Sequence, residues 1–222
     1  MKQIAIILSG CGNRDGSELQ ETLSLLLAID RRGWQYQCFA PQGKYNVVSH
    51  VDGNESGEQR DLFVESARIA RGNILPLSQY RPADFDALAL PGGMGAARNL
   101  STYAFDGAHM TVRDDVADAI LSTHAAHKPV VAMCIAPMVL ACVLGRKTEG
   151  LQLTLGHPGP AAQAAEAMGA THVVCDATGV CVDPANRVLT TPAYMVATRI
   201  TEIFQGADNL IAQLKELFET KN

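Results

Sequence analysis

Cys134 is the side chain whose position most favours nucleophilic chemistry. It directly follows the apolar run Val130–Met133, and Pro137 marks the start of a helix just beyond it. A nucleophile elbow needs small residues two positions before and two after the nucleophile, because the strained turn brings strand and helix into close contact. Ala132 and Ala136 meet this requirement. A thiol at a helix N-terminus is expected to have a lowered pKa, since the positive end of the helix dipole favours the thiolate.

A second loop has the composition of an oxyanion-binding turn. Pro91-Gly92-Gly93 follows the expected strand at residues 86–90. Glycines placed directly after a strand allow a ligand oxygen to approach backbone N–H groups. A tight turn that binds no ligand explains the same residues, so this motif alone leaves both interpretations open.

The loop at residues 9–16 contains Gly10, Gly12 and Gly16 and is similar to a dinucleotide fingerprint. The third glycine comes one residue late, however, and the next strand, at residues 34–40, ends without the acidic residue that would hold a ribose. We therefore expect no NAD site, and instead a turn in which all three glycines have positive φ.

Two glutamates follow this loop on the first turn of a helix. Glu18 and Glu21 are one helical turn apart, so their carboxylates point back toward the loop. On most helices such residues are only favourable partners of the helix dipole. A role for one or both of them at the loop stays open beside this interpretation.

Composition limits the functions that these residues can serve. The chain has 222 residues, with 47% hydrophobic, 18% charged and a net charge of −5, which is typical of a globular protein and not of a disordered one. Without a Lys/Arg cluster, nucleic acid and anionic membranes are not expected as partners. The six cysteines contain no C-x-x-C pair, so free thiols and no metal site are expected.

The start of the chain and one uncharged stretch bear on location. The apolar run at residues 4–8 is too short for a signal peptide, so we expect a cytoplasmic protein. Residues 129–145 carry no charge and reach the lower length limit of a membrane span. A buried strand followed directly by a buried helix explains this stretch better.

Strands and helices are expected to alternate along the chain. This alternation predicts a doubly wound, mostly parallel α/β sheet flanked by helices, in a single domain over residues 1–222. The expected strands are residues 3–8, 34–40, 86–90, 130–133, 152–155, 180–182 and 188–190. The expected helices are residues 17–32, 58–70, 113–126, 136–144, 161–168 and 194–218, with a loop at 45–57. Ligands of such sheets bind at the carboxyl ends of the strands, where the three loops above lie.

These motifs together resemble a known family. The PGG loop, the elbow cysteine and the glutamates of the first helix are similar to the ThiJ/PfpI superfamily, which has the class I glutamine-amidotransferase-like, flavodoxin-like fold. The resemblance is closer to the ElbB-type branch, also called enhancing lycopene biosynthesis or isoprenoid biosynthesis proteins. It is carried by Leu8-Ser9-Gly10-Cys11-Gly12, Asp15-Gly16-Ser17-Glu18, Cys38-Phe39-Ala40-Pro41, Pro91-Gly92-Gly93 through Asn99-Leu100-Ser101, Met133-Cys134-Ile135-Ala136-Pro137 and Thr190-Thr191-Pro192-Ala193-Tyr194-Met195.

The resemblance implies a glutathione-independent glyoxalase. Such an enzyme converts glyoxal to glycolate, or methylglyoxal to lactate, and the resemblance implies neither a metal nor an organic cofactor. Cys134 would add to the aldehyde carbon. The backbone N–H groups of Gly93, which follows Gly92 in the PGG loop, and of Ile135, which follows Cys134, would hold the oxyanion.

A glutamate would then move a proton between the two carbons. Glu21 matches the glutamate of the superfamily best, by its distance to Gly33, and Glu18 is nearer the loop, so both are kept as candidate acid/base groups with Glu21 slightly favoured. The small dicarbonyl substrate is the expected partner, and related folds commonly form homodimers.

Other functions share the same residues. His157 falls where some superfamily members carry a histidine that assists the cysteine, although a surface histidine is the more common outcome at such a position. The sequence lacks the late His-x-Glu pair of glutamine amidotransferases, which disfavours glutamine hydrolysis. A redox sensor based on oxidation of Cys134 and a non-catalytic regulatory protein linked to isoprenoid metabolism are the alternatives.

Overall fold

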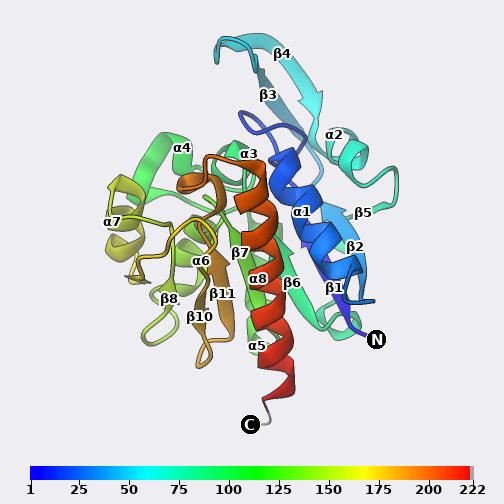
Figure 1. Ribbon diagram of the computed structural model, residues 1–222. Coiled ribbons are helices and arrows are strands. Elements are labelled where there is room, and N and C mark those ends of the chain that lie inside the picture. Colours follow the sequence, from blue (N-terminus) through cyan, green and yellow to red (C-terminus); the bar gives the residue numbers. More distant parts are fainter. Residues whose placement is uncertain (221–222) are drawn as a thin grey trace.

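A central sheet runs through the molecule (Figure 1). The computed structural model describes residues 1–220, which form a seven-stranded sheet of order β10-β11-β7-β6-β1-β2-β5. Only β10 runs antiparallel to its neighbour within this sheet, and the predicted mostly parallel α/β architecture is confirmed. The strands are β1 (Gln3–Ile7), β2 (Gln35–Ala40), β5 (Ile74–Pro76), β6 (Ala87–Leu90), β7 (Val130–Met133), β10 (Cys181–Asp183) and β11 (Val188–Thr191).

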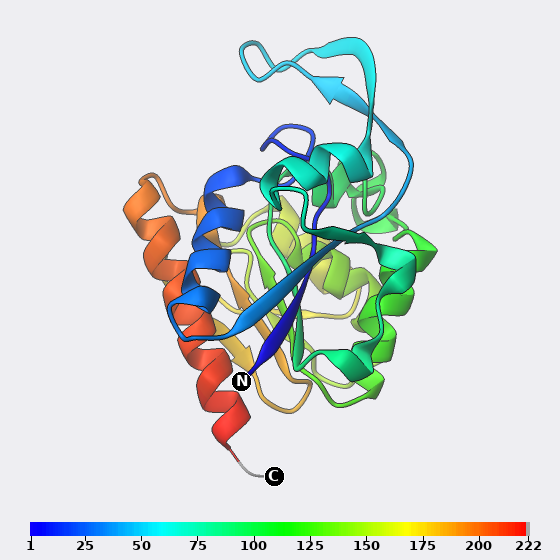
Figure 2. The same ribbon diagram turned by 90° about the vertical axis from the view of Figure 1, so that its right-hand side faces the viewer.

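The three central strands are apolar because helices cover both faces of the sheet. Nearly every residue of β1, β6 and β7 is buried, as expected for parallel strands without a solvated side. Figure 2 shows α1 (Leu19–Asp30) and α8 (Ile200–Glu219) on one side of the sheet and α5 (Asp114–Ala125) on the other. One continuous hydrophobic core extends from Ile4 to Leu217.

The uncharged stretch at residues 129–145 is a strand followed by a helix, as predicted. It comprises β7 and α6 (Pro137–Leu144), in which all residues but Cys142 are buried. Across residues 1–220, none of the helices is both long enough and apolar enough to cross a bilayer.

The segment between β2 and β5 differs from the prediction. The expected loop at residues 45–57 and the first residues of the expected helix form a hairpin of β3 (Lys44–Val48) and β4 (Glu55–Asp61), and α2 (Leu62–Ile69) begins only after it. The hairpin extends beyond the sheet and helices (Figures 1 and 2). Almost all of β4 is exposed and polar, so its sequence carries no alternating hydrophobic signal.

The first and last helices begin and pack differently from the prediction. Glu18, not Ser17, is the N-cap of α1. The predicted leucines lie on α1, but Leu19, Leu23 and Leu27 are 41%, 54% and 47% exposed. The face toward the core is formed by Leu25, Leu26, Ala28 and Ile29. The expected last helix begins at Ile200, since residues 193–195 form a separate 3₁₀ turn.

The remaining elements are short. The expected strand at 152–155 is β8 (Gln152–Leu153), which pairs with β9 (Thr171–His172) in a separate two-stranded sheet. The other helices are α3 (Met94–Arg98), α4 (Tyr103–Asp106) and α7 (Pro160–Ala167), with 3₁₀ turns at Leu77–Gln79, Pro82–Asp84, Gly107–His109 and Ala193–Met195.

Candidate active site

The three predicted loops meet at one edge of the sheet. Strands β7, β6 and β1 are neighbours in the strand order and run parallel, so their carboxyl ends lie side by side. The loops that follow them carry Cys134, Gly92-Gly93 and the segment leading to Glu21. The fold therefore brings together residues that are far apart in the sequence.

Cys134 occupies a nucleophile elbow, as predicted. Its φ is +60°, a left-handed conformation that costs a non-glycine residue on the order of 1 kcal/mol or more. The turn is fixed on both sides, because the Cys134 N–H donates to the Thr191 carbonyl at 3.0 Å and the Ala136 N–H donates to the Met133 carbonyl at 3.0 Å. Ala132 and Ala136 are both fully buried. Larger side chains at these positions would have no free space, which explains the need for small residues.

Gly92 is the point of closest approach between these loops. A Cβ atom on Gly92 would lie 2.3 Å from the Cys134 Cβ and 2.3 Å from the Glu21 Oε2. The missing side chain therefore lets the carboxylate and the thiol lie next to each other.

The glycines of the loop at residues 9–16 agree only in part with the prediction that all three have positive φ. Gly10 and Gly12 have positive φ, but Gly16 does not. Its Cβ would instead meet neighbouring backbone at 2.2 Å, so close packing explains that glycine.

Glu21 is a completely buried carboxyl group beside Cys134. Its Oε1 accepts a hydrogen bond from the Tyr194 backbone N–H at 3.2 Å, while Oε2 has no hydrogen-bond partner among residues 1–220. Burial raises the pKa of Glu21 to about 7, a rise that the Tyr194 N–H opposes and the nearby Glu18 carboxylate increases. Near neutral pH this carboxyl group can therefore both accept and donate a proton.

The Cys134 thiol is less acidic than the sequence predicts. Burial raises the pKa of Cys134 well above its ordinary value, and the adjacent Glu21 carboxylate raises it further. The backbone N–H groups of Gly93 and Ile135 act in the opposite direction and lower the pKa of the thiol. The predicted lowering by the helix dipole is thus wrong, because desolvation outweighs it. The resting pair is a neutral thiol beside a carboxyl group that titrates near neutrality.

Glu18 has a different position from Glu21. Its Oε2 accepts a hydrogen bond from the Glu21 backbone N–H at 2.6 Å and so caps α1. Burial raises the pKa of Glu18 as well, although this side chain is only half-buried. Glu18 therefore orients the helix turn that presents Glu21, and Glu21 is the carboxylate next to the thiol.

These groups open into one pocket of about 570 Å³. Among the described residues, the lining contains two carboxylates and no Lys, Arg or His, so a neutral ligand suits it better than an anion. Sequence reasoning missed five of the lining residues. The full lining consists of Asn13, Glu18, Gln20, Glu21, Gly93, Met94, Cys134, Ile135, Tyr194 and Met195.

Tyr194 is the most informative of the missed residues. It holds Glu21 through its backbone N–H, and its hydroxyl donates a hydrogen bond to the Gln20 side chain. Tyr194 follows β11, the strand adjacent to β7, so the rule that ligands bind at strand ends would have pointed to it.

His157 does not join the pocket. Its side chain is 59% exposed and its Nε2 lies 3.8 Å from the Asp176 Oδ1. The residue is not among those that line the pocket, and it follows β8, which pairs with β9 outside the central sheet. We assign His157 no part in the chemistry below. No metal-binding group of three or more His, Cys, Asp or Glu side chains forms within residues 1–220.

Comparison with known proteins identifies the family. No family model matches the chain. The human glutamine amidotransferase-like class 1 domain-containing protein 3, mitochondrial, is 39% identical over 226 residues, covering 97% of this chain and 83% of the relative. A solved structure, the isoprenoid biosynthesis protein with amidotransferase-like domain from Ehrlichia chaffeensis, is 33% identical with a TM-score of 0.89, covering 96% of this chain and 99% of the other. The chain belongs to the ElbB/ES1 family of class I glutamine amidotransferase-like proteins.

The wider relationships of this ElbB/ES1 member agree with the predicted fold. The rat ES1 protein homolog, mitochondrial, is 38% identical over 97% of this chain and 84% of its own length. A DJ-1 superfamily protein of Salmonella typhimurium has a TM-score of 0.60 at 20% identity, covering 99% of this chain and 95% of the other. At that identity the likeness shows the fold alone, which is the DJ-1/ThiJ/PfpI fold.

The predicted cytoplasmic location is contradicted by the ElbB/ES1 relatives. The human and rat proteins, and the ES1 protein of Danio rerio, all carry the word mitochondrial in their names. The prediction rested on the apolar run at residues 4–8. That run forms the buried strand β1 and the residue that follows it. Its apolar character therefore reflects burial in the sheet and carries no information about the location of the protein.

Proposed function

We propose that the protein is a glutathione-independent glyoxalase that converts glyoxal, or methylglyoxal, to the corresponding hydroxy acid. The observation that carries this proposal is the pairing of the Cys134 thiol with the fully buried Glu21, whose pKa is raised to about 7. The absence of cationic side chains among the described residues that line the pocket favours a neutral dicarbonyl substrate. The DJ-1/ThiJ/PfpI fold supports a cysteine-based role in general terms.

The first step forms a hemithioacetal. The Cys134 sulfur adds to one aldehyde carbon of glyoxal while its proton passes to the Glu21 carboxylate, so that no free thiolate accumulates. The C=O bond becomes a C–O⁻ group, which the N–H groups of Gly93 and Ile135 would hold. Support for this role is that both N–H groups act on the Cys134 sulfur and lower the pKa of the thiol. Protonation of this oxygen by Glu21 completes the hemithioacetal.

The second step is an internal redox exchange between the two carbons. Glu21 removes the hydrogen of the sulfur-bearing carbon as a proton, and the electron pair moves into an enediolate that spans both carbons. The hydroxyl proton of the first carbon passes to the oxygen of the second. The same carboxyl group returns a proton to the second carbon. The first carbon is now a thioester and the second a primary alcohol, so one carbon is oxidised and the other reduced without an external oxidant.

Hydrolysis regenerates the enzyme. A water molecule, deprotonated by Glu21, attacks the thioester carbonyl, and the C–S bond breaks. The Cys134 sulfur takes the proton, and glycolate leaves. The sum is one glyoxal plus one water to one glycolic acid.

Proton transfer through a carboxyl group makes a testable prediction for the product. We expect purified protein in D₂O to convert glyoxal to glycolate with one deuterium on the methylene carbon, because the Glu21 proton exchanges with solvent before it is returned. ¹H NMR of the product measures this incorporation. Glycolate that keeps both original hydrogens would indicate a hydride shift and contradict the role of Glu21, and failure to form glycolate would contradict the proposed function.

The rate of glyoxal conversion should depend on pH, because Cys134 and Glu21 both titrate. Below neutral pH both Glu21 and Cys134 are protonated and no base is present, so kcat/KM for glyoxal is expected to rise with pH to a midpoint near 7 and then level off. Initial rates measured between pH 5 and 9 test this. A flat profile, or a midpoint near the ordinary pKa of a glutamate, would contradict the assignment of Glu21 as the base.

Gly92→Ala should disturb both folding and turnover. The added Cβ would overlap Cys134 and Glu21, so the loops must move apart. We expect a loss of about 2 kcal/mol in the free energy of unfolding and a fall in kcat/KM of about 100-fold, measured by urea denaturation and glyoxal consumption. Gly159→Ala is the matched control, because nothing lies within 4 Å of the corresponding Cβ. Wild-type turnover in Gly92→Ala would show that the two loops need not touch.

The redox-sensor alternative loses its main support. It relied on a lowered thiol pKa, whereas the pKa of Cys134 is raised by burial and by Glu21. A non-catalytic regulatory role would leave the burial of an unpartnered carboxylate oxygen next to a thiol without a purpose.

A further inference from the structure

The pocket at Cys134 is larger than glyoxal requires. Its volume of about 570 Å³ lies in the range of about 300–1,000 Å³ that is usual for pockets that bury drug-sized ligands. Glyoxal consists of only two carbons and two oxygens, and it would fill a small part of this volume. Space for a further group of the substrate is therefore present beside the thiol.

Two methionines from distant parts of the chain line this space. Met94 begins α3, and Met195 ends the 3₁₀ turn that follows β11. Their backbones are fixed, because the Met94 N–H donates to the Asn13 carbonyl at 2.8 Å and the Met195 N–H donates to the Pro192 carbonyl at 2.9 Å. The two side chains are 37% and 38% exposed although both are large and apolar. Flexible thioether side chains of this kind adapt their shape to an apolar ligand.

Both methionines lie beside the atoms that react. The N–H of the residue before Met94 acts on the Cys134 sulfur. The N–H of the residue before Met195 donates to the Glu21 Oε1 at 3.2 Å. Because consecutive Cα atoms are about 3.8 Å apart, each methionine begins one residue away from a contact with the reactive pair. A chain attached to the reacting carbons can therefore contact both methionine side chains.

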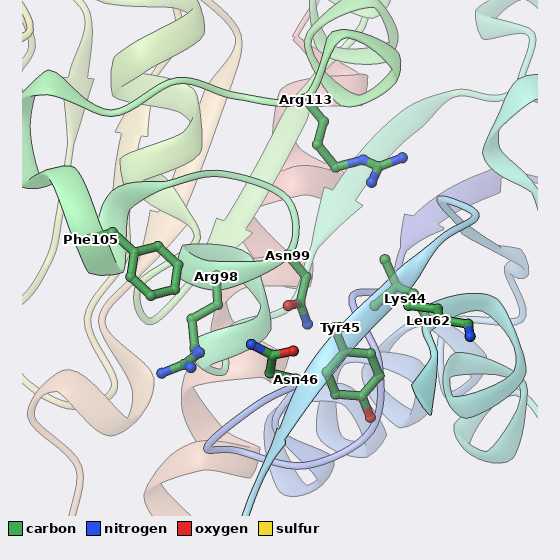
Figure 3. A pocket seen from close by; sticks show the side chains of 8 residues that line it. All are labelled: Lys44, Tyr45, Asn46, Leu62, Arg98, Asn99, Phe105 and Arg113. Carbon is green, nitrogen blue, oxygen red and sulfur yellow. The ribbon is translucent and has the colours of Figure 1, made fainter. Parts of the chain in front are cut away.

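Charge lies on the other side of α3. This helix begins with Met94 in the Cys134 pocket and ends with Arg98 in a second cleft of about 310 Å³, which Lys44 and Arg113 also line (Figure 3). Among the described residues, the lining of the Cys134 pocket has two carboxylates and no cation, so it disfavours an anionic group. The exposed methionine side chains favour an apolar group in its place.

We propose that the substrate of the Cys134 site is a 2-oxoaldehyde with an unbranched apolar chain of several carbons, and that Met94 and Met195 bind this chain. The inference rests on the proposed function, because the reaction is the same. The sulfur adds to the aldehyde carbon, and the hydrogen that Glu21 removes from this carbon returns as a proton to the ketone carbon. The aldehyde carbon is oxidised and the ketone carbon is reduced, so R–CO–CHO and H₂O give R–CH(OH)–COOH.

A homologous series of linear 2-oxoaldehydes tests the proposal, because the reacting group stays the same while the chain grows. From methylglyoxal through 2-oxobutanal and 2-oxopentanal to 2-oxohexanal, we expect kcat/KM of the wild-type protein to rise about threefold for each methylene, since each one leaves water for the methionine surface. 4,5-Dioxopentanoate has a carboxylate where 2-oxopentanal has a methyl group. Its kcat/KM should be at least about tenfold lower than that of 2-oxopentanal, because the pocket offers this charge no partner. Initial rates of dicarbonyl loss measure both effects.

Variants of the methionines show whether these side chains bind the substrate chain. Met94→Gln and Met195→Gln remove apolar surface at nearly unchanged size. We expect the rise in kcat/KM per methylene to be smaller in each variant, and the double variant to show almost no dependence on chain length. Leu23→Gln is the matched control and should keep the wild-type dependence. Leu23 is 54% exposed on the helix that carries Glu21, but it does not line the pocket.

The possible failures are distinguishable. A wild-type protein that consumes glyoxal but shows a flat or falling series would overturn this inference and leave the proposed function intact. The same holds if the double variant keeps the full dependence on chain length, or if 4,5-dioxopentanoate reacts faster than 2-oxopentanal. If none of the aldehydes is consumed, glyoxal included, the proposed function is wrong and this inference is wrong with it.

Discussion

Cys134→Ser is expected to lower kcat/KM for glyoxal by about a thousand-fold or more. A serine hydroxyl is a much weaker nucleophile than a thiol, and Glu21, with a pKa near 7, is a poor base for an alcohol. The variant should fold normally, because serine has nearly the size of cysteine and the surrounding small residues keep their contacts. We expect its free energy of unfolding to lie within about 1 kcal/mol of the wild-type value.

Single-turnover measurements make this prediction specific. Mass spectrometry of the wild-type protein mixed rapidly with glyoxal should detect the covalent adduct on Cys134, and the serine variant should show none at that residue. Cys175→Ser is the control, because Cys175 is a half-buried free thiol that does not line the pocket. Equal rates in wild type and Cys134→Ser would remove the basis for the proposed enzyme.

Glu21→Gln is expected to make the protein more stable and nearly inactive. The folded carboxyl group keeps its proton up to about pH 7, whereas an unfolded glutamate releases it near 4.5. Between these values the folded state binds more protons, so the free energy of unfolding falls as pH rises through this window. The difference between the folded and unfolded pKa of Glu21 corresponds to about 3 kcal/mol of the free energy of unfolding, and this contribution is lost in full above pH 7. The neutral amide of glutamine does not titrate, so the variant does not lose this stability as the pH rises.

Denaturant unfolding at several pH values measures the increase in the free energy of unfolding of Glu21→Gln over wild type. At pH 8 the variant should exceed wild type by up to about 3 kcal/mol, and near pH 4 the two should converge. Turnover of glyoxal should fall by about a thousand-fold, and the rise of kcat/KM around pH 7 should disappear. Glu18→Gln is the control for position on the same helix turn, because Glu18 is only half-buried. A stability difference between Glu21→Gln and wild type that does not change with pH would contradict the raised pKa.

Features encoded in adjacent residues could be predicted from the sequence. The elbow at Cys134 is such a case, because the apolar strand, the small neighbours and the proline of the next helix all lie within a few positions. The convergence of the three loops also followed, since parallel strands present their carboxyl ends at the same edge.

Features that depend on distant residues could not be predicted. The pKa of Cys134 is governed by its burial and by Glu21, which lies on another element, so the local helix dipole gave the wrong direction. The position of His157 depends on the pairing of β8 with β9, which two-residue strands do not reveal. The hairpin strand β4 was missed because polar side chains on both of its faces give no periodic signal.

The hydrogen bond from the Tyr194 N–H to Glu21 joins residues that are 173 positions apart. Tyr194 takes its place only when β11 has joined the sheet and α8 has docked on α1, so this bond is a contact of the complete molecule. In a chain whose C-terminal third is not yet in place, Glu21 lacks this hydrogen bond. The arrangement of Glu21 and Cys134 on which the proposed chemistry depends is therefore complete only when the last long-range contacts of folding have formed.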